Sequence, residues 1–119
     1  MASMTEGKSP APKRCNAIIN ENDKKYVRVM LTAPGLRVKR QFNFSMAPKN
    51  CKILDLEYRK NSVYIKFVIN EGLGNESVYV YENDEDTFFN GPIQTDKSYL
   101  KYTENGIDIY AKKVSDWSP

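Results

Sequence analysis

The sequence predicts an all-β fold, an antiparallel β-sandwich of about seven strands. Short segments of alternating apolar and polar residues recur at roughly even spacing, separated by turn-forming residues, and no segment shows helical apolar spacing over ten residues. The same pattern also fits a small barrel, so sandwich and barrel both stay open. With 119 residues the chain is long enough for one domain with an ordinary core.

The N-terminal segment differs from the rest in composition. Residues 1–16 contain two prolines and three basic residues and have no periodic apolar face. Such a composition is typical of a disordered basic arm. We therefore expect residues 17–119 to form a single β-sandwich domain.

Three strands are expected in the first half of the domain. Residues 26–31 alternate, with valines and a leucine on one face and Arg28 opposite, until Ala-Pro-Gly at 33–35 ends the strand. Residues 36–44 form the second strand, with a bulge or edge position at Arg40. A loop at 47–50 precedes the third strand, residues 53–58. The residues expected to face the core are Val27, Val29, Leu31, Leu36, Val38, Phe42, Phe44, Leu54, Leu56 and Tyr58.

Four more strands are expected in the second half. A hairpin turn at 59–62 leads into residues 63–69, the cleanest alternation of the chain, and a Gly-rich turn precedes a short strand at 78–81. The last two strands, 99–102 and 107–111, flank Asn105 and Gly106. This pair predicts a type I′ turn, because both central residues of that turn need a positive φ. The inward residues of 63–69 are Val63, Ile65, Phe67 and Ile69.

The composition argues against most enzyme classes. The chain has no histidine, which removes Ser-His-Asp and Cys-His catalysis and the zinc sites that need imidazole. Its two cysteines, Cys15 and Cys51, form no CxxC motif, which fits a reducing compartment. No Gly-rich phosphate loop is present. We therefore expect a non-enzyme with no cofactor and no metal.

Charge and hydropathy point to a macromolecular partner. No apolar stretch is long enough to cross a bilayer, and the first 14 residues lack the apolar core of a signal peptide, so we expect a cytoplasmic or nuclear protein that binds no membrane. The formal net charge is +3, but residues 1–60 carry 13 Lys and Arg against 5 Asp and Glu, while residues 61–119 carry 5 against 10. A chain polarised in this way can meet partners through a basic surface, an acidic surface or both.

Two candidate sites could in principle carry chemistry. Cys51 has Lys49 and Lys52 nearby, whose charges can lower the pKa of a thiol, but without histidine no proton relay follows. Adjacent solvated carboxylates in an acidic loop at 82–86 give no separation of acid and base roles, so we interpret that loop as a surface for a basic partner. The acidic residues of the loop are Glu82, Asp84, Glu85 and Asp86.

An alternative function is the binding of single-stranded nucleic acid by a small OB-like barrel. In that hypothesis Arg37, Lys39 and Arg40 contact phosphates and exposed tyrosines stack on bases. The low net charge and the acidic second half favour a protein partner instead. The tyrosines considered for stacking are Tyr26, Tyr58 and Tyr64.

The last third of the chain carries a family resemblance. It resembles the end of a CS domain, the β-sandwich of the calcyclin-binding protein, NudC proteins and several co-chaperones. Segments 26–31, 33–35, 54–58 and 63–69 are similar to the earlier parts of that domain in the same order. The residues that carry the resemblance are Phe89, Gly91, Ile93, Tyr99, the sequence GIDIYAKKV at 106–114, and Trp117.

The resemblance implies a co-chaperone or adaptor that contacts the ninety-kilodalton heat-shock chaperone or its clients. It places an aromatic residue and a lysine on the contact face, at the positions of Tyr58 and Lys112. We expect Arg37 and Lys39 to meet acidic groups of the partner and the acidic loop to steer a basic region. The single tryptophan, Trp117, is expected to pack the last strand onto the sandwich.

Overall fold

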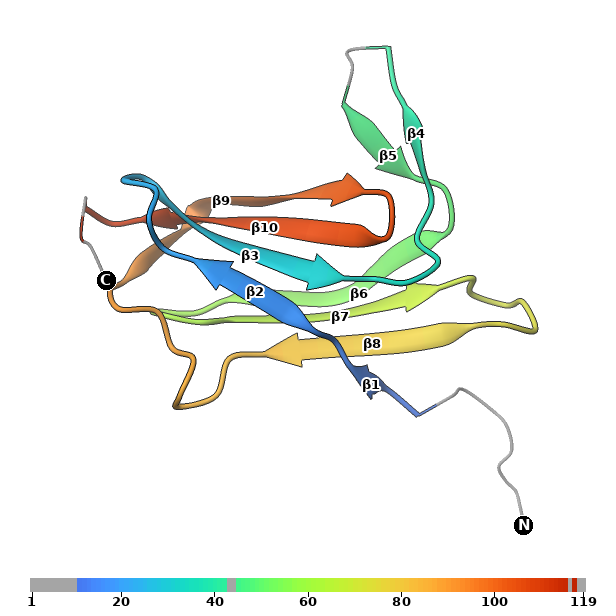
Figure 1. Cartoon of the computed structure of the whole chain (residues 1–119), viewed down its shortest axis with the longest axis horizontal. Coiled ribbons are helices and arrows are strands. Elements are labelled where there is room, and N and C mark those ends of the chain that lie inside the picture. The colour runs from blue at the N-terminus through green and yellow to red at the C-terminus, as the bar shows by residue number, and fades with distance from the viewer. Residues whose placement is uncertain (1–10, 43–44, 116, 118–119) are drawn as a thin grey trace.

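The computed structural model describes residues 11–42, 45–115 and 117. This part of the chain contains strands and no helix. The strands form two stacked sheets with a ribbon standing out from one side (Figure 1). The predicted all-β sandwich is therefore confirmed. Within the described ranges no helix could cross a membrane.

The described residues contain ten strands, three more than the seven expected. They are β1 (Lys13–Arg14), β2 (Ala17–Asn20), β3 (Tyr26–Thr32), β4 (Val38–Arg40), β5 (Met46–Pro48), β6 (Cys51–Tyr58), β7 (Val63–Ile69), β8 (Ser77–Glu82), β9 (Ile93–Thr103) and β10 (Gly106–Lys113). One sheet has the order β1-β8-β7-β6, the other β2-β3-β10-β9, and β4 and β5 form a separate two-stranded ribbon. Neighbouring strands are antiparallel except β1, which runs parallel to β8.

The core lies between β3 and β10 of one sheet and β7 of the other. The alternation expected in residues 26–31 and 63–69 is confirmed, because every predicted inward residue of these two segments is buried. Since successive side chains of a strand point to opposite faces, burial of one set places the residues between them on the outer face of the sheet. The buried residues of these three strands include Val27, Val29, Leu31, Val63, Ile65, Phe67, Ile69, Ile107, Ile109 and Ala111.

The N-terminal segment closes one side of the sandwich. β1 pairs with β8 at the edge of one sheet, and β2 pairs with β3 at the edge of the other. Between β1 and β2, Cys15 is buried, and its thiol donates to the carbonyl of Thr32 at 2.9 Å. Residues 13–15, expected to belong to a disordered arm, are instead held by strand pairing and burial. Residues 1–10 lie outside the described residues.

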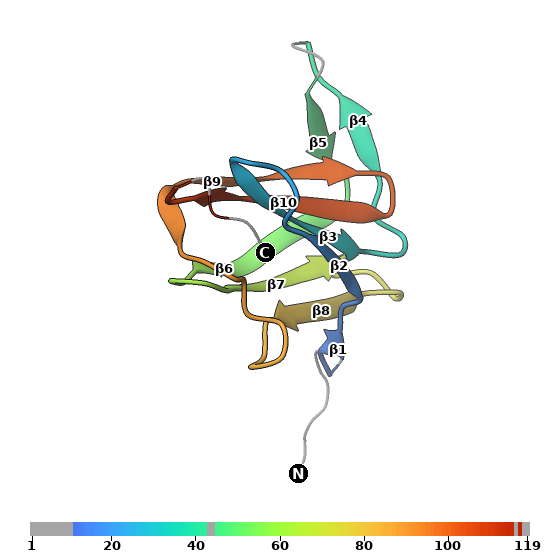
Figure 2. The ribbon, with the colours of Figure 1, turned by 60° about the vertical axis from the view of Figure 1, so that its left-hand side comes forward.

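The strand expected over residues 36–44 is shorter and leaves the sandwich. β4 pairs with β5, so the loop expected at 47–50 overlaps a strand, and the ribbon projects away from both sheets (Figures 1 and 2). Leu36 is buried as expected, but Phe42 is 103% exposed, so its predicted inward placement is wrong. An isolated ribbon has no second layer to cover an apolar face. Arg40 lies on an edge strand, one of its two expected positions, and Phe44 falls outside the described residues.

A bulge changes the face pattern of β6. The pairing with β7 shifts register between Ile53 and Asp55. Ile53 and Leu56 consequently pack against the core, whereas Leu54, predicted to point inward, is 43% exposed. A single inserted residue exchanges the two faces of a strand, which is why the simple alternation failed at this position.

The hairpin expected between the last two strands is present with a different turn. Gly106 pairs with Thr103, so the two-residue turn consists of Glu104 and Asn105, and of these only Asn105 has a positive φ, 60°. The predicted type I′ turn centred on Asn105 and Gly106 is therefore wrong. Gly106 is the first residue of β10, where a Cβ atom would lie 2.7 Å from Oγ1 of Thr103.

The C-terminal segment packs onto one end of the sandwich, as expected for Trp117. The indole Nε1 donates to the carbonyl of Pro92 at 2.9 Å, and the ring lies against Gly91. Lys113 is only 1% exposed, and its ammonium donates to the carbonyls of Glu21 and Trp117, each at 2.8 Å. The same ammonium lies 4.4 Å from the centroid of the indole ring, so the buried Lys113 holds Trp117 in place.

Candidate functional site

Three tyrosines gather on the outer face of the β2-β3-β10-β9 sheet. Tyr26 comes from β3, Tyr99 from β9 and Tyr110 from β10. Tyr99 is opposite Tyr110 in the pairing of β9 with β10, and Tyr110 is opposite Arg28 in the pairing of β10 with β3. The strand register therefore brings together rings that are up to 84 positions apart in the sequence.

The three rings pack directly on one another. Tyr99 and Tyr110 are stacked, with ring centroids 5.1 Å apart and an interplanar angle of 9°. Tyr26 meets both rings edge-on, at 5.7 Å from Tyr99 and 6.1 Å from Tyr110. Stacked and edge-to-face arrangements are the favoured geometries of aromatic pairs. The cluster is thus held in one conformation before any partner arrives.

A cation accompanies each tyrosine. Arg28 lies 5.5 Å from the centroid of Tyr110, and Lys112 lies 5.6 Å from that of Tyr26. Lys101 lies over two rings, 5.3 Å from the centroid of Tyr110 and 5.9 Å from that of Tyr99. We call the six residues Tyr26, Arg28, Tyr99, Lys101, Tyr110 and Lys112 the tyrosine face.

One of the three cations already has a carboxylate partner. Arg28 donates to Asp108 at 2.8 Å, and this bond raises the pKa of the guanidinium above its ordinary value. Within the described ranges, no carboxylate lies within ion-pair distance of Lys101 or Lys112. Lys101 and Lys112 therefore contact rings but no carboxylate of the described residues.

Two hollows flank the stacked pair of rings. One, of about 250 Å³, is lined by Asn20, Asp23, Arg28 and the three tyrosines. The other, of about 550 Å³, lies where the ribbon meets the sheet and is lined by residues of β5, β9 and β10. Tyr110 lines both hollows. Concave surface on either side of an aromatic ridge can receive protruding side chains of a bound molecule.

The two residues assigned by the CS-domain resemblance lie in different settings. Lys112 belongs to the tyrosine face. Tyr58, at the end of β6, packs against the core, and its buried hydroxyl has no hydrogen-bond partner among the described residues. Burial raises the pKa of Tyr58 to about 12. Of the two residues, only Lys112 therefore lies on the tyrosine face.

The other predicted contact residues lie near the two ends of the sandwich. Arg37 precedes the ribbon and pairs with Glu104 at 3.5 Å, while Lys39 is exposed on β4. The acidic loop follows β8 at the opposite end, where Glu82 pairs with Arg59 (Figure 1). Predicted basic and acidic contacts are therefore not brought together.

Within the acidic loop the carboxylates are used unequally. Asp84 accepts hydrogen bonds from the Asp86 backbone and the Thr87 hydroxyl, and so shapes the loop. Glu85 and Asp86 are exposed. Among the residues that the structure describes, no three Cys, Asp or Glu side chains are grouped to hold a metal ion.

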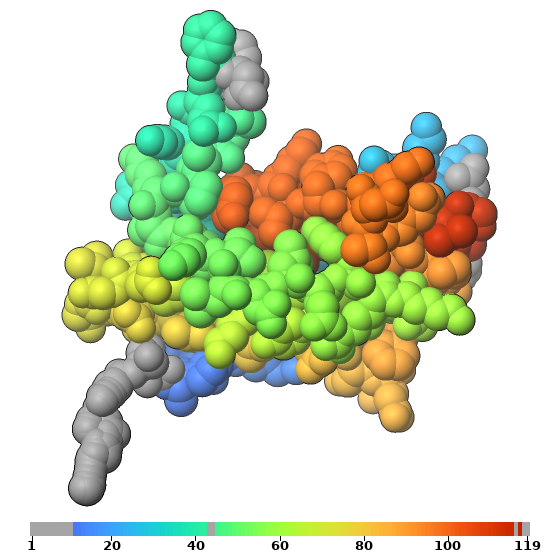
Figure 3. All heavy atoms as spheres, turned by 180° about the vertical axis from the view of Figure 1, so that it is seen from behind, coloured from blue at the N-terminus to red at the C-terminus, as the bar shows by residue number. Residues whose placement is uncertain are grey.

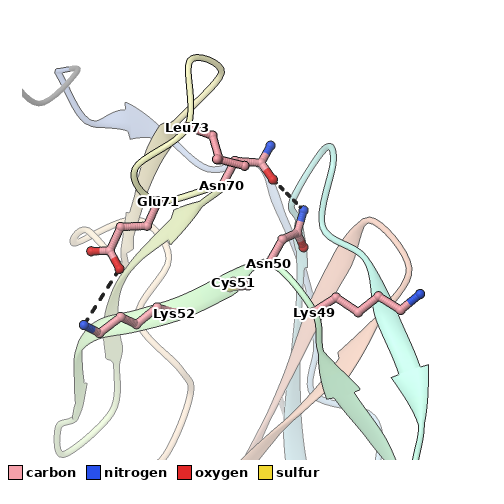
Figure 4. A pocket seen from close by; sticks show the side chains of 7 residues that line it. All are labelled: Lys49, Asn50, Cys51, Lys52, Asn70, Glu71 and Leu73. Atoms are coloured by element: carbon pink, nitrogen blue, oxygen red, sulfur yellow. Dashed lines mark hydrogen bonds and ion pairs between the residues drawn. The ribbon is translucent and has the colours of Figure 1, made fainter.

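Cys51 lies in a shallow hollow of about 320 Å³ beside the base of the ribbon (Figure 4). Lys49 points away from it, and Lys52 reaches across to Glu71 at 3.9 Å. Burial raises the pKa of the Cys51 thiol to about 12. Loss of solvent is the cause of this rise, so the thiol is a poor nucleophile, which agrees with the interpretation of Cys51 as a non-catalytic cysteine.

A pattern in the sequence could have pointed to the tyrosine face. Tyrosine followed two positions later by lysine or arginine occurs five times, at 26–28, 58–60, 64–66, 99–101 and 110–112. Residues two apart on a strand share a face. The first, fourth and fifth pairs form the tyrosine face, but only the register shows that those three strands are neighbours.

Neither of two comparisons with known proteins gives a relative of this chain. No model of a known protein family matches the sequence, and no curated protein matches it significantly.

Proposed function

We propose that this chain is a non-enzymatic protein-interaction module, a co-chaperone or adaptor of the CS-domain type, that binds its partner through the tyrosine face. The observation that carries the proposal is the cluster of three mutually packed tyrosines, each with its own cation, on the outer face of a sheet. Tyrosine and arginine are enriched among the residues that dominate binding energy at protein interfaces.

The mechanism is presentation of a preformed surface. Rings that are already stacked lose little conformational freedom when a partner covers them, so more of the contact energy remains as affinity. The cations lie beside the rings and can meet acidic groups at the rim of the interface. At the end of the molecule with the acidic loop, Glu85 and Asp86 steer a basic region of the partner during approach.

The resemblance to CS domains suggests the ninety-kilodalton heat-shock chaperone as the first partner to test. Lys112, the lysine matched to the family's contact face, belongs to the tyrosine face. Both cysteines are free, which is typical of a reducing compartment, and we propose a cytoplasmic location.

The test is retention of the purified chaperone on the immobilised full chain. We expect Tyr99→Ala and Lys112→Glu each to weaken binding at least tenfold, the loss typical of a central interface residue. Lys97→Glu is the matched control for the charge change. Lys97 lies on β9, the strand of Tyr99, is exposed and contacts no ring of the described residues. Retention unchanged by both Tyr99→Ala and Lys112→Glu removes the tyrosine face from the binding site.

Single-stranded nucleic acid is the second candidate ligand, since exposed rings with nearby cations are also the chemistry of base stacking. Two observations disfavour it. Tyr99 and Tyr110 stack on each other, and neither Arg37 nor Lys39 lies over a ring in the described part of the chain. Salt-sensitive retention of an oligonucleotide, lost in Tyr99→Ala, would favour this candidate.

A further inference from the structure

Lys101 is the cation of the tyrosine face that is best placed to receive a carboxylate from outside. Asp108 is directly opposite Lys101 in the pairing of β9 with β10. Asp108 nevertheless pairs with Arg28, and the Lys101 ammonium lies over the rings of Tyr99 and Tyr110. An incoming carboxylate therefore meets an exposed ammonium without first displacing a carboxylate of the described residues.

The Lys101 side chain also borders the larger of the two hollows. This ribbon hollow, of about 550 Å³, is lined by Met46, Leu100, Lys101, Tyr102, Asp108 and Tyr110. Its volume falls within the range of roughly 300–1,000 Å³ that is common for ligand sites. Seen from behind, the notch between the ribbon and the strand β9 is open to the outside (Figure 3).

The lining of the ribbon hollow combines apolar and charged groups. Met46 is 37% exposed on β5 and offers a flexible thioether wall, while Leu100 and Tyr102 are half-buried. Methionine adapts its shape to an incoming apolar side chain. Asp108 is held by Arg28, so Lys101 is the charged group of the lining that lacks a carboxylate partner among the described residues.

We infer that the ribbon hollow and Lys101 together bind an acidic segment of a partner protein, with one apolar side chain in the hollow and a neighbouring carboxylate on the Lys101 ammonium. This inference rests on the proposed function, because it names the chemistry of the segment that the tyrosine face binds. Lys112, the second cation of the face without a carboxylate partner among the described residues, lies over the ring of Tyr26 and extends the acidic preference across the face. Charge complementarity selects an acidic segment over a basic or neutral one.

The test is an NMR titration of the isotope-labelled full chain with a synthetic heptapeptide that has one central leucine and glutamates on both sides. We expect amide shifts at the residues of β5, β9 and β10 that line the hollow. Replacing the glutamates of the peptide by glutamines is expected to weaken binding at least tenfold. Lys101→Gln is expected to weaken it about fivefold, the size of one partly exposed charge pair.

Two further variants separate the parts of the site. Met46→Gln keeps the length of the side chain and removes its apolar character, and is expected to weaken the leucine peptide but not a peptide with serine in the central position. Lys97→Gln makes the same charge change as Lys101→Gln on the same strand outside both hollows, and is expected to leave binding unchanged.

Several outcomes would overturn the inference. They are no shifts at millimolar peptide, equal binding of the glutamine peptide, shifts confined to Arg37, Lys39 and Arg40, or stronger shifts of the same face by a single-stranded oligonucleotide. Chaperone retention through the tyrosine face without acidic-peptide binding overturns this inference and leaves the proposed function standing. Peptide binding without chaperone retention supports this inference and overturns only the choice of chaperone.

Discussion

Gly91→Ala is the substitution for which the structure makes the sharpest prediction. A Cβ atom on residue 91 would lie 2.5 Å from Cδ2 and Cε2 and 2.6 Å from Cγ of Trp117. These atoms belong to the body of the indole, so the ring itself has to move. Because the φ of Gly91 is not positive, alanine can adopt the backbone conformation there, and the clash with the ring is the expected source of destabilisation.

The magnitude follows from what the ring does in its native place. Moving it breaks the hydrogen bond from Nε1 to Pro92, separates the ring from the Lys113 ammonium and disturbs one of the two carbonyl acceptors of that buried charge. A hydrogen bond contributes about 1 kcal/mol and a cation–π contact about 0.5–2 kcal/mol, so with the lost ring packing we expect a cost of about 2–4 kcal/mol.

Trp117 provides its own assay, because it is the only tryptophan of the chain. We expect Gly91→Ala to shift the native fluorescence emission to longer wavelength and to lower the urea midpoint measured by circular dichroism. In a Trp117→Ala background the same substitution is expected to cost less than about 0.5 kcal/mol. Gly74→Ala is the matched control, since nothing lies within 4 Å of its added Cβ. An unchanged emission and midpoint in Gly91→Ala would refute the contact between Gly91 and Trp117.

Four further outcomes are expected. Phe42→Ser changes the free energy of unfolding by less than about 0.5 kcal/mol, because the ring is fully exposed, whereas Phe67→Ala lowers it by about 3–5 kcal/mol. Urea denaturation measures both, and a comparable loss for Phe42→Ser would contradict the projecting ribbon. Tyr58→Phe is neutral or stabilising by up to about 1 kcal/mol, because it removes a buried hydroxyl that has no partner, and thermal unfolding measures this. Burial raises the pKa of Cys15 to about 11 and those of Cys51 and Tyr58 to about 12, from 9.0, 9.0 and 10.0, so the native state keeps protons that the unfolded state loses. The contribution of these three groups to the free energy of unfolding is therefore complete below pH 9 and is lost between pH 9 and 12. Urea midpoints that stay flat from pH 8 to 11 would contradict this prediction. For the same reason iodoacetamide at pH 8 alkylates both thiols at least tenfold more slowly in the native than in the unfolded chain, as mass spectrometry would detect.

Strands that turn one uninterrupted apolar face toward the core were predictable from the sequence. Val63, Ile65, Phe67 and Ile69 alternate without interruption in β7 and are all buried. Such a strand keeps its register because a slip by one residue would expose its whole apolar set. The same reasoning holds for β3, and the two strands together define the predicted sandwich.

The predictions for single residues were wrong where the surrounding fold, and not the alternation of the strand, decides whether a side chain is buried. Phe42 continues the apolar alternation begun by Leu36 and Val38, yet it lies on a ribbon with no sheet above it. Leu54 follows the alternation of β6 but lies in a bulge, which periodicity alone cannot reveal. At the N-terminus, Cys15 is buried by contacts with strands far along the chain. The burial or exposure of each of these residues depends on segments distant in the sequence, which a short stretch of sequence does not contain.

The candidate site illustrates the same limit more strongly. Each tyrosine of the face can be assigned to the outer side of its strand from alternation with buried neighbours such as Val27 and Ile109. What makes a site of them is the central position of β10, which has β3 on one side and β9 on the other and so juxtaposes Tyr26, Tyr99 and Tyr110. Tyr64, with Lys66 two positions later, has the same local pattern on the other sheet, where its ring meets Arg59 but no second tyrosine. Strand order therefore decides which of several identical local patterns are brought together on one face. Exchanging residues 64 and 66 for alanine is expected to leave chaperone retention intact, where Tyr99→Ala weakens it at least tenfold.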